Sequence, residues 1–196
     1  MYQSLLKDST FIANELLEID QRIAKNTQNG DCLICRSPLH VANFPRKVRS
    51  GAFDFGTEHD IRFSFCCAKC RKRHTPPSLR FFGRCIYTSA VVIAFALIFA
   101  VIEKKLSLIA KMLGPNRRTL KRWHEKLENL PKTKIGRLLQ ARFCEPVTTD
   151  TLAQFIINGP SSEMAARLIK ICKALAHLSG SSSLFDKNIF YAEFAQ

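Results

Sequence analysis

The chain has 196 residues, of which 46% are hydrophobic, a composition typical of a globular protein with a buried core. Residues 71–142 contain seventeen Lys and Arg against three Asp and Glu, so this segment accounts for the whole formal net charge of +14. An excess so concentrated argues against an evenly solvated basic surface and favours a polyanionic partner, either nucleic acid or an anionic membrane.

The first predicted element is an amphipathic helix over residues 9–25. Its apolar residues recur at the spacing of one helical face, and Ser9 or Thr10 can cap its N-terminus. No apolar run follows the mixed residues 1–8, so no secretory signal is expected. We assign residues 1–28 to a helix that packs against the rest of the chain.

Two close cysteine pairs follow and predict a metal site. The candidate ligands are Cys32, Cys35, Cys67 and Cys70, with Cys66 or His74 as an alternative for one of them. Each C-x2-C turn offers two sulfurs, and zinc prefers a tetrahedron of soft ligands. Four thiolates leave no position for water, so the expected Zn²⁺ is structural. The other interpretation is a set of ordinary buried cysteines.

Residues 29–84 are expected to form a small antiparallel zinc ribbon, because residues 38–46 look extended and the apolar residues of 53–65 alternate. Pro76 and Pro77 then exclude both a helix and a central strand. The cations around them define a basic arm that is predicted to contact phosphates: Arg71, Lys72, Arg73, Arg80 and Arg84. The alternative is a linker that packs against the ribbon with its arginines exposed.

Residues 85–102 are eighteen consecutive uncharged residues, which is the lower limit for a membrane span. Cations lie on both sides of this stretch, so the charge of its flanks does not orient it in a membrane. Its content of Ala, Thr and Ser favours instead a central helix that other helices surround. We therefore expect no membrane partner, and a span at 85–102 is the alternative.

Residues 103–128 predict two helices joined by a tight turn. Gly114 can end the first helix, Asn116 can cap the second, and Leu120, Trp123 and Leu127 share one inner face. This layout is typical of a recognition helix in the major groove. The predicted DNA contacts are Asn116, Arg117, Arg118, Thr119, Lys121 and Arg122. The alternative is an ordinary helical hairpin with a charged face.

Residues 85–142 are thus assigned to a helix-turn-helix domain, and residues 143–196 to C-terminal helices and a tail that pair with another copy or with a partner. Cys85, Cys144 and Cys172 have apolar surroundings and are expected to be buried thiols. The acidic residues are scattered, Glu58 and Asp60 among them, and the sequence shows neither a cluster of carboxylates nor a Ser/His/Asp order that can be placed in an active site. These patterns predict no enzyme activity.

Three stretches together carry a family resemblance. They are Cys32-x2-Cys35, the run from Phe65 to Arg84, and Arg117-Arg118-Thr119-Leu120-x-Arg122-Trp123. They resemble small bacterial zinc-ribbon and helix-turn-helix proteins, some encoded beside mobile elements, and the ribbon is similar to one at the front of some insertion-sequence transposases. The resemblance implies a protein that binds double-stranded DNA and is located in the cytoplasm, at the nucleoid. It implies a role in transposition or in transcription regulation, with a transposase as a further partner.

The predicted fold class is therefore α+β, mainly α, with a small antiparallel zinc ribbon followed by a helix-turn-helix bundle. The predicted function is that of a non-enzymatic, zinc-containing DNA-binding protein. Two other hypotheses stay open: a protein-interaction module that binds a transposase or polymerase subunit, and a membrane-anchored basic protein. An RNA-binding protein is less favoured, because a helix-turn-helix fits duplex DNA better than the grooves of an A-form helix.

Overall fold

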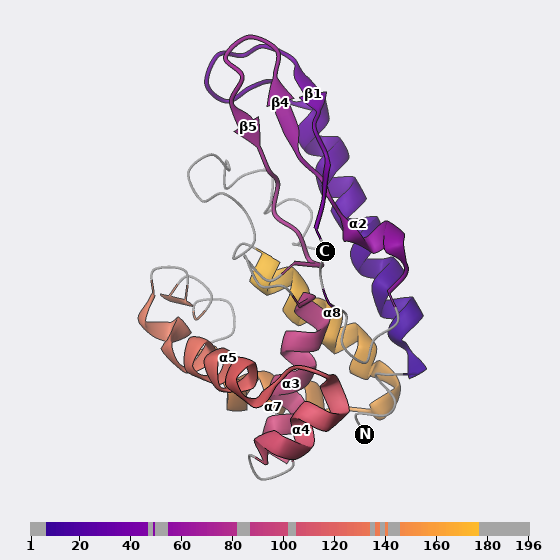
Figure 1. Ribbon diagram of the computed structural model, residues 1–196, viewed down its shortest axis with the longest axis vertical. Coiled ribbons are helices and arrows are strands. Elements are labelled where there is room, and N and C mark those ends of the chain that lie inside the picture. Colours follow the sequence, from indigo (N-terminus) through magenta and orange to yellow (C-terminus); the bar gives the residue numbers. More distant parts are fainter. Residues whose placement is uncertain are drawn as a thin grey trace.

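The computed structural model describes residues 7–46, 49, 55–81, 87–101, 105–133, 136–137, 140 and 146–176. These residues are mainly helical with a small antiparallel sheet, which confirms the predicted α+β class with a dominant α component. Figure 1 shows an elongated molecule, with the strands and the upper part of α2 at one end and the other helices at the opposite end. The helices are α2 (Ser9–Asn29), α3 (Ser89–Val101), α4 (Leu106–Leu113), α5 (Arg117–Asn129), α7 (Thr149–Ile157) and α8 (Met164–Leu175). The strands are β1 (Leu39–Val41), β2 (Phe44–Pro45), β3 (Ile61–Arg62), β4 (Phe65–Cys67) and β5 (Arg73–His74).

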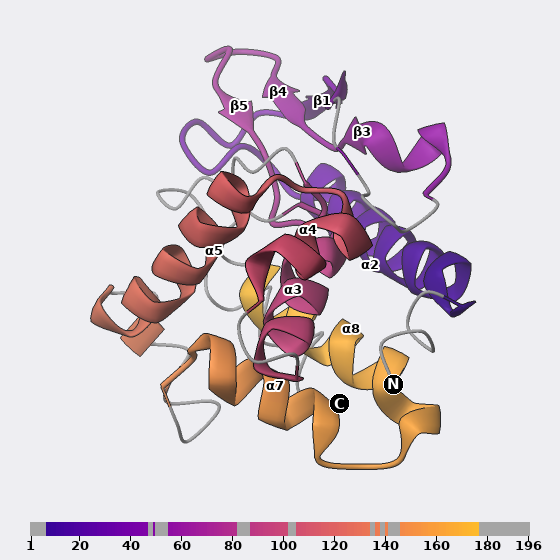
Figure 2. The same ribbon diagram turned by 60° about the horizontal axis from the view of Figure 1, so that its bottom comes forward.

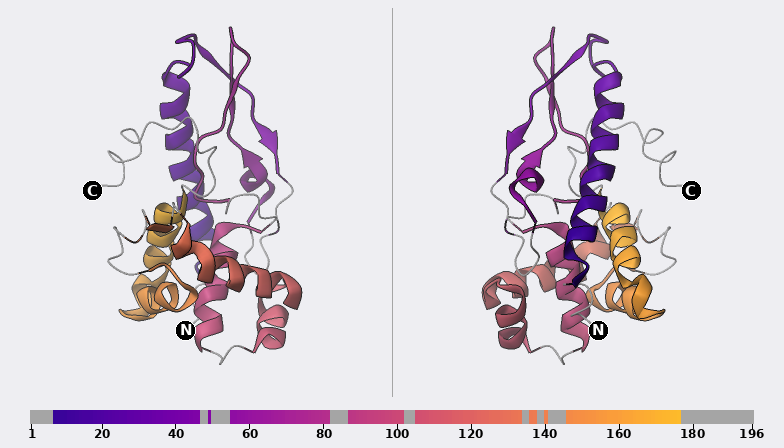
Figure 3. Two further views of the ribbon diagram at one scale, coloured as in Figure 1. Left: turned by 90° about the vertical axis from the view of Figure 1, so that its left-hand side faces the viewer. Right: turned by 90° about the vertical axis from the view of Figure 1, so that its right-hand side faces the viewer.

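The long helix α2 belongs to both ends of the molecule. Ile12 and Leu16 pack into the helical core, whereas Ala24 belongs to the small core of the strands. Both side views in Figure 3 show α2 running alongside the strands, which together with their turns are called the ribbon below. The predicted cap was wrong, because Asp8 is the N-cap residue and its side chain makes no capping hydrogen bond. The helix also continues beyond residue 25, to Asn29.

The strands form two antiparallel sheets, one in the order β1-β4-β5 and the other pairing β2 with β3. The simple alternation predicted for residues 53–65 does not hold in the described part, residues 55–65, because Arg62 and Ser64 are buried while Phe63 is partly exposed. Arg62 reaches inward to stack on the ring of Phe81 and to donate a hydrogen bond to the carbonyl of Pro76. A cation with these partners can occupy a position that the pattern assigned to solvent.

Helix α3 forms the centre of the helical end, as its composition predicted. Its residues Ser89–Phe99 are all buried, and α3 contacts α4, α5, α7 and α8. Figure 2 shows these helices gathered around it. None of the helices in the described residues is both long enough and apolar enough to cross a membrane.

A three-residue turn joins α4 to α5. Gly114 has a φ of 88° and donates its N–H to the carbonyl of Ala110 at 2.9 Å, which ends α4. Asn116 accepts a hydrogen bond from the Thr119 N–H at 2.8 Å, which caps α5 as predicted. The indole of Trp123 meets the rings of Tyr87 and Phe95 edge-on, with centroids 5.1 and 5.7 Å apart, so α5 is packed against the central helix.

The C-terminal helices predicted within residues 143–196 include α7 and α8 in the part of that segment that the structure describes. A capping box between Thr148 and Thr151 starts α7, and Arg167 on α8 donates to the carbonyl of Ile156 at its end. Cys172 is buried, as predicted, and burial raises the pKa of its thiol to about 12. Cys85, Cys144 and the residues from 177 onward, which include the predicted tail, lie outside the described residues.

Candidate functional site

Four thiols come together at the tip of the ribbon, and their spacing fits one metal ion. The sulfurs of Cys32, Cys35, Cys67 and Cys70 all lie within 4.8 Å of one another. Two of the sulfur pairs, Cys32 with Cys70 and Cys35 with Cys67, are 3.6 and 3.3 Å apart. A tetrahedral zinc ion with Zn–S bonds of about 2.3 Å places its sulfurs about 3.8 Å apart, so the observed cluster has the size of a zinc site.

The two cysteine turns share one backbone geometry. The N–H of Cys32 donates to the carbonyl of Ser37 at 2.9 Å, and the N–H of Cys67 donates to the carbonyl of Lys72 at 3.0 Å, five residues on in each case. The residue after the second cysteine is left-handed in both turns: Arg36 has a φ of 57° and Arg71 a φ of 58°. A residue with a β-carbon in this conformation costs about 1 to 2 kcal/mol, so both arginines sit in a strained position.

Cys66 and His74 occupy different places relative to the cluster. The sulfur of Cys66 lies near the carbonyls of Cys67 and Arg71, outside the group of four. Nε2 of His74 lies 3.3 Å from the sulfur of Cys32, and burial lowers the pKa of the imidazole, which favours its neutral form. His74 is therefore placed to orient a ligand sulfur from beside the cluster.

The thiols influence one another's ionisation. Hydrogen bonds from the Ser37 side chain and the Cys67 thiol lower the pKa of Cys35 from 9.0 to about 6. A backbone hydrogen bond with Lys72 acts to lower the pKa of Cys70, but burial and the neighbouring sulfurs raise it to about 12. Adjacent thiolates repel one another, and a divalent cation bound between them would offset that repulsion.

A second group of predicted residues lies on α5 at the other end of the molecule. Leu120, Trp123 and Leu127 are buried, as predicted from their spacing. The other face carries the predicted DNA contacts: Asn116, Arg117, Arg118, Lys121 and Arg122 are exposed, and Thr119 is half-buried. The first acid on this helix is Glu125, which lies 4.0 Å from the Lys121 ammonium.

The basic arm of residues 71–84 divides into an exposed and a buried part. Arg71, Lys72 and Arg73 are exposed, and the Arg73 guanidinium lies 5.3 Å from the centroid of the Phe44 ring. Arg80 corrects the prediction of a phosphate contact, because it is 1% exposed and its guanidinium donates to protein acceptors. Residues 76–81 are buried, so the linker interpretation describes them better, and Arg84 lies outside the described residues.

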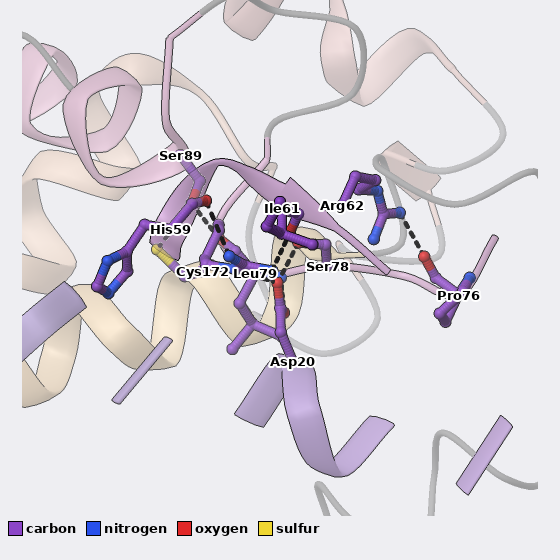
Figure 4. Close-up of polar contacts among 10 residues, drawn as sticks. Asp20, His59, Ile61, Arg62, Pro76, Ser78, Leu79, Ser89 and Cys172 are labelled. Carbon is purple, nitrogen blue, oxygen red and sulfur yellow. Dashed lines mark hydrogen bonds and ion pairs between the residues drawn. The ribbon is translucent and has the colours of Figure 1, made fainter. Parts of the chain in front are cut away.

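The acceptor at the centre of this buried part is Asp20 on α2, which the sequence did not single out. Its carboxylate accepts from the Ser78 hydroxyl, from the Leu79 N–H at 2.6 Å and from Nε of Arg80 at 2.8 Å (Figure 4). Arg80 also donates to the carbonyls of His59 and Ile61 at 2.8 and 2.7 Å. The available signal was a carboxylate in the apolar face of the first predicted helix, between Leu16 and Ile23.

The neighbours of Asp20 extend the network to the helical core. The hydroxyl of Ser89, at the start of α3, donates to the carbonyl of Leu79, and the thiol of Cys172 lies 3.6 Å from that hydroxyl. His59, between the acidic Glu58 and Asp60, is 4% exposed. Its ring lies 5.7 Å from that of Phe55. Ribbon, arm, α2, α3 and α8 thus meet around one buried ion pair.

Comparison of the chain with protein-family models, with curated proteins and with solved structures gave no match in any of the three.

Proposed function

We propose that this chain is a non-enzymatic, zinc-containing protein that binds double-stranded DNA through the N-terminal half of α5. The observation that carries the proposal is the exposed cationic face of this helix. Arg117, Arg118, Lys121 and Arg122 point away from the buried Leu120 and Trp123, with no acid before Glu125. Side chains near the N-terminus of such a helix reach base edges in the major groove, and arginine pairs with guanine there.

The geometry of the turn supports this proposal. A helix that enters a groove needs a fixed orientation relative to the helix before it. The left-handed Gly114 and the Asn116 cap fix the orientation of α5 relative to α4. Trp123 packs on the central helix and holds the opposite face of α5 in place. The cations of α5 therefore project from a rigid support, which is what base recognition requires.

The metal in this proposal is a structural Zn²⁺ held by the thiolates of Cys32, Cys35, Cys67 and Cys70. With all four positions filled by sulfur, the ion supplies folding free energy to a ribbon whose own core is small. A zinc ribbon followed by a helix-turn-helix is in keeping with the resemblance to proteins encoded beside mobile elements. We therefore assign the chain to transposition or to transcription regulation, with a transposase as a partner in the former case.

The test measures binding to duplexes selected from a random pool. We expect Arg117→Ala together with Arg118→Ala to abolish the specific mobility shift, because these side chains face solvent and carry the base contacts. The far-ultraviolet circular dichroism spectrum and the unfolding midpoint should stay unchanged. Lys170→Ala together with Arg22→Ala removes the same charge from exposed positions on α8 and α2 and serves as the control.

Binding that survives the Arg117/Arg118 change unaltered would overturn the proposal. Equal weakening by the control pair would show that only net charge matters, and this outcome also contradicts base recognition by α5. Specific binding must in addition weaken as salt increases, because phosphate contacts release counterions.

A further inference from the structure

The strained arginines of the two cysteine turns have no structural task of their own. Glycine would adopt the left-handed φ of Arg36 and Arg71 without a steric cost. Both residues are exposed, and among the residues that the structure describes neither guanidinium makes a hydrogen bond or an ion pair. The fold therefore bears the strain of two arginines without using their charge, which points to a use outside the fold.

Both arginines directly follow cysteines of the same sulfur cluster, so their backbones are held beside one another. Arg36 follows Cys35 and Arg71 follows Cys70, and these cysteines contribute sulfurs that lie within 4.8 Å. The metal site thus fixes the two cationic side chains at one tip of the molecule. Arg36 and Arg71 are named the knuckle arginines below.

The tip also presents two neighbouring apolar side chains to solvent. Leu33 and Ile34, between the first two cysteines, are 48% and 53% exposed. Residues 31–37 and 67–73 contain five Arg and Lys and one acid, Asp31. The tip is therefore an apolar pair in a surface with a strong positive charge.

We propose that the knuckle tip is a second nucleic-acid contact, in which the knuckle arginines bind phosphates and Leu33 and Ile34 pack against the sugars and bases between them. The planar guanidinium fork matches the oxygens of a phosphate, and apolar side chains wedged beside bases are a known mode of minor-groove contact. Figure 1 places the ribbon tip and α5 at opposite ends of the molecule. The tip therefore holds a different part of the nucleic acid from α5, or a second segment.

The charge of the tip favours nucleic acid over an acidic protein or an anionic membrane. Two apolar side chains anchor a protein only weakly in a lipid surface. Stable membrane binding requires a larger buried apolar area or a covalently attached lipid chain. A protein interface depletes lysine at its centre, whereas Lys69 lies in the turn opposite Leu33 and Ile34. The choice of nucleic acid also rests on the proposed function of α5, and the experiment separates the two.

The experiment exploits the strain. Arg36→Gly together with Arg71→Gly removes both guanidiniums and relieves both left-handed positions, so the fold should keep or raise its unfolding midpoint and its zinc content. We measure the Kd of the full chain for a fluorescent duplex of mixed sequence as a function of salt. The Gly pair should weaken binding by about tenfold and lower the slope of log Kd against log salt by about two.

Three further sets of variants show whether a loss of binding comes from the tip, from net charge or from α5. The Arg22→Ala and Lys170→Ala pair removes the same charge elsewhere and should change the slope by less than half as much. Leu33→Ser with Ile34→Ser should weaken binding while leaving the salt slope unchanged. The Gly pair is also combined with Arg117→Ala and Arg118→Ala. If this fourfold variant loses the duplex binding that the Arg117→Ala, Arg118→Ala protein retains, the result supports a nucleic-acid contact at the tip, even if α5 proves not to read DNA.

Three results would overturn the inference. One is a Gly pair that binds duplex with the Kd and salt slope of the wild-type chain. Another is a Gly pair that loses zinc, because the arginines would then have a structural task. The third is a Gly pair that keeps duplex binding but loses binding to phosphatidylserine vesicles or to an acidic protein, which would assign the tip to that partner.

Discussion

At the scale of single residues, the strand register decides which of two neighbouring cysteines joins the sulfur cluster. Cys67 pairs with Leu39 across the sheet, and Cys66 pairs with His40 and Arg73. Successive side chains of a strand point to opposite faces, so only one of the two adjacent thiols can join Cys32, Cys35 and Cys70. The sequence left this choice open, because both cysteines lie within reach of Cys70 along the chain.

This register predicts opposite behaviour for two adjacent substitutions. Cys67→Ser should lower zinc affinity by more than about 100-fold. Loss of a residue that only supports a metal ligand already lowers metal affinity by about 10- to 100-fold, and loss of the ligand itself should lower it further. Cys66→Ser should leave zinc affinity and stoichiometry unchanged, which makes it the matched control. Competition with a chromophoric zinc chelator measures both, and equal affinity of the two variants would refute the ligand set.

At the scale of elements, the turn between α4 and α5 is set by two local features that the sequence displayed. Gly114 occupies a left-handed position and Asn116 caps the following helix. Both features depend on neighbours in sequence, so they could be predicted without the tertiary structure. The packing of Trp123 against Tyr87 and Phe95 could not, since these two rings precede Trp123 by 36 and 28 residues in the chain.

Gly114→Ala tests the conformation of this turn. We expect the free energy of unfolding to fall by about 1 kcal/mol or more, because alanine is strained at a φ of 88°. Ser107→Ala, at an exposed position of α4, should leave the free energy of unfolding unchanged or raise it slightly. Urea titration followed by circular dichroism measures both, and a stable Gly114→Ala protein would show that the turn is not left-handed in solution.

At the scale of the whole molecule, one buried ion pair connects the ribbon end to the helical end. Asp20 lies on the helix that both ends share, and Arg80 lies on the segment that leads from one end to the other. Each of these side chains is 1% exposed. Removing one partner leaves a buried charge without compensation, which is far more costly than the loss of a surface pair.

We therefore expect Asp20→Asn to destabilise the protein by about 3 to 5 kcal/mol, since Arg80 keeps its charge in a buried site. Glu18→Gln removes a carboxylate from an exposed position of the same helix and should change stability by less than about 0.5 kcal/mol. Equilibrium unfolding in urea gives both values. A loss below about 1 kcal/mol for Asp20→Asn would mean that the carboxylate is not buried as described.

The sequence by itself determined the features that depend on neighbours along the chain. Spacing predicted the cysteine cluster, the helical faces and the capped turn, because turns, caps and helical periodicity are local. Only the tertiary structure decided which of two cysteines joins the cluster, and that Arg80 is an interior cation and not a phosphate contact. An arginine appears the same in sequence whether it faces solvent or a buried carboxylate, and Asp20 lies sixty residues away from it.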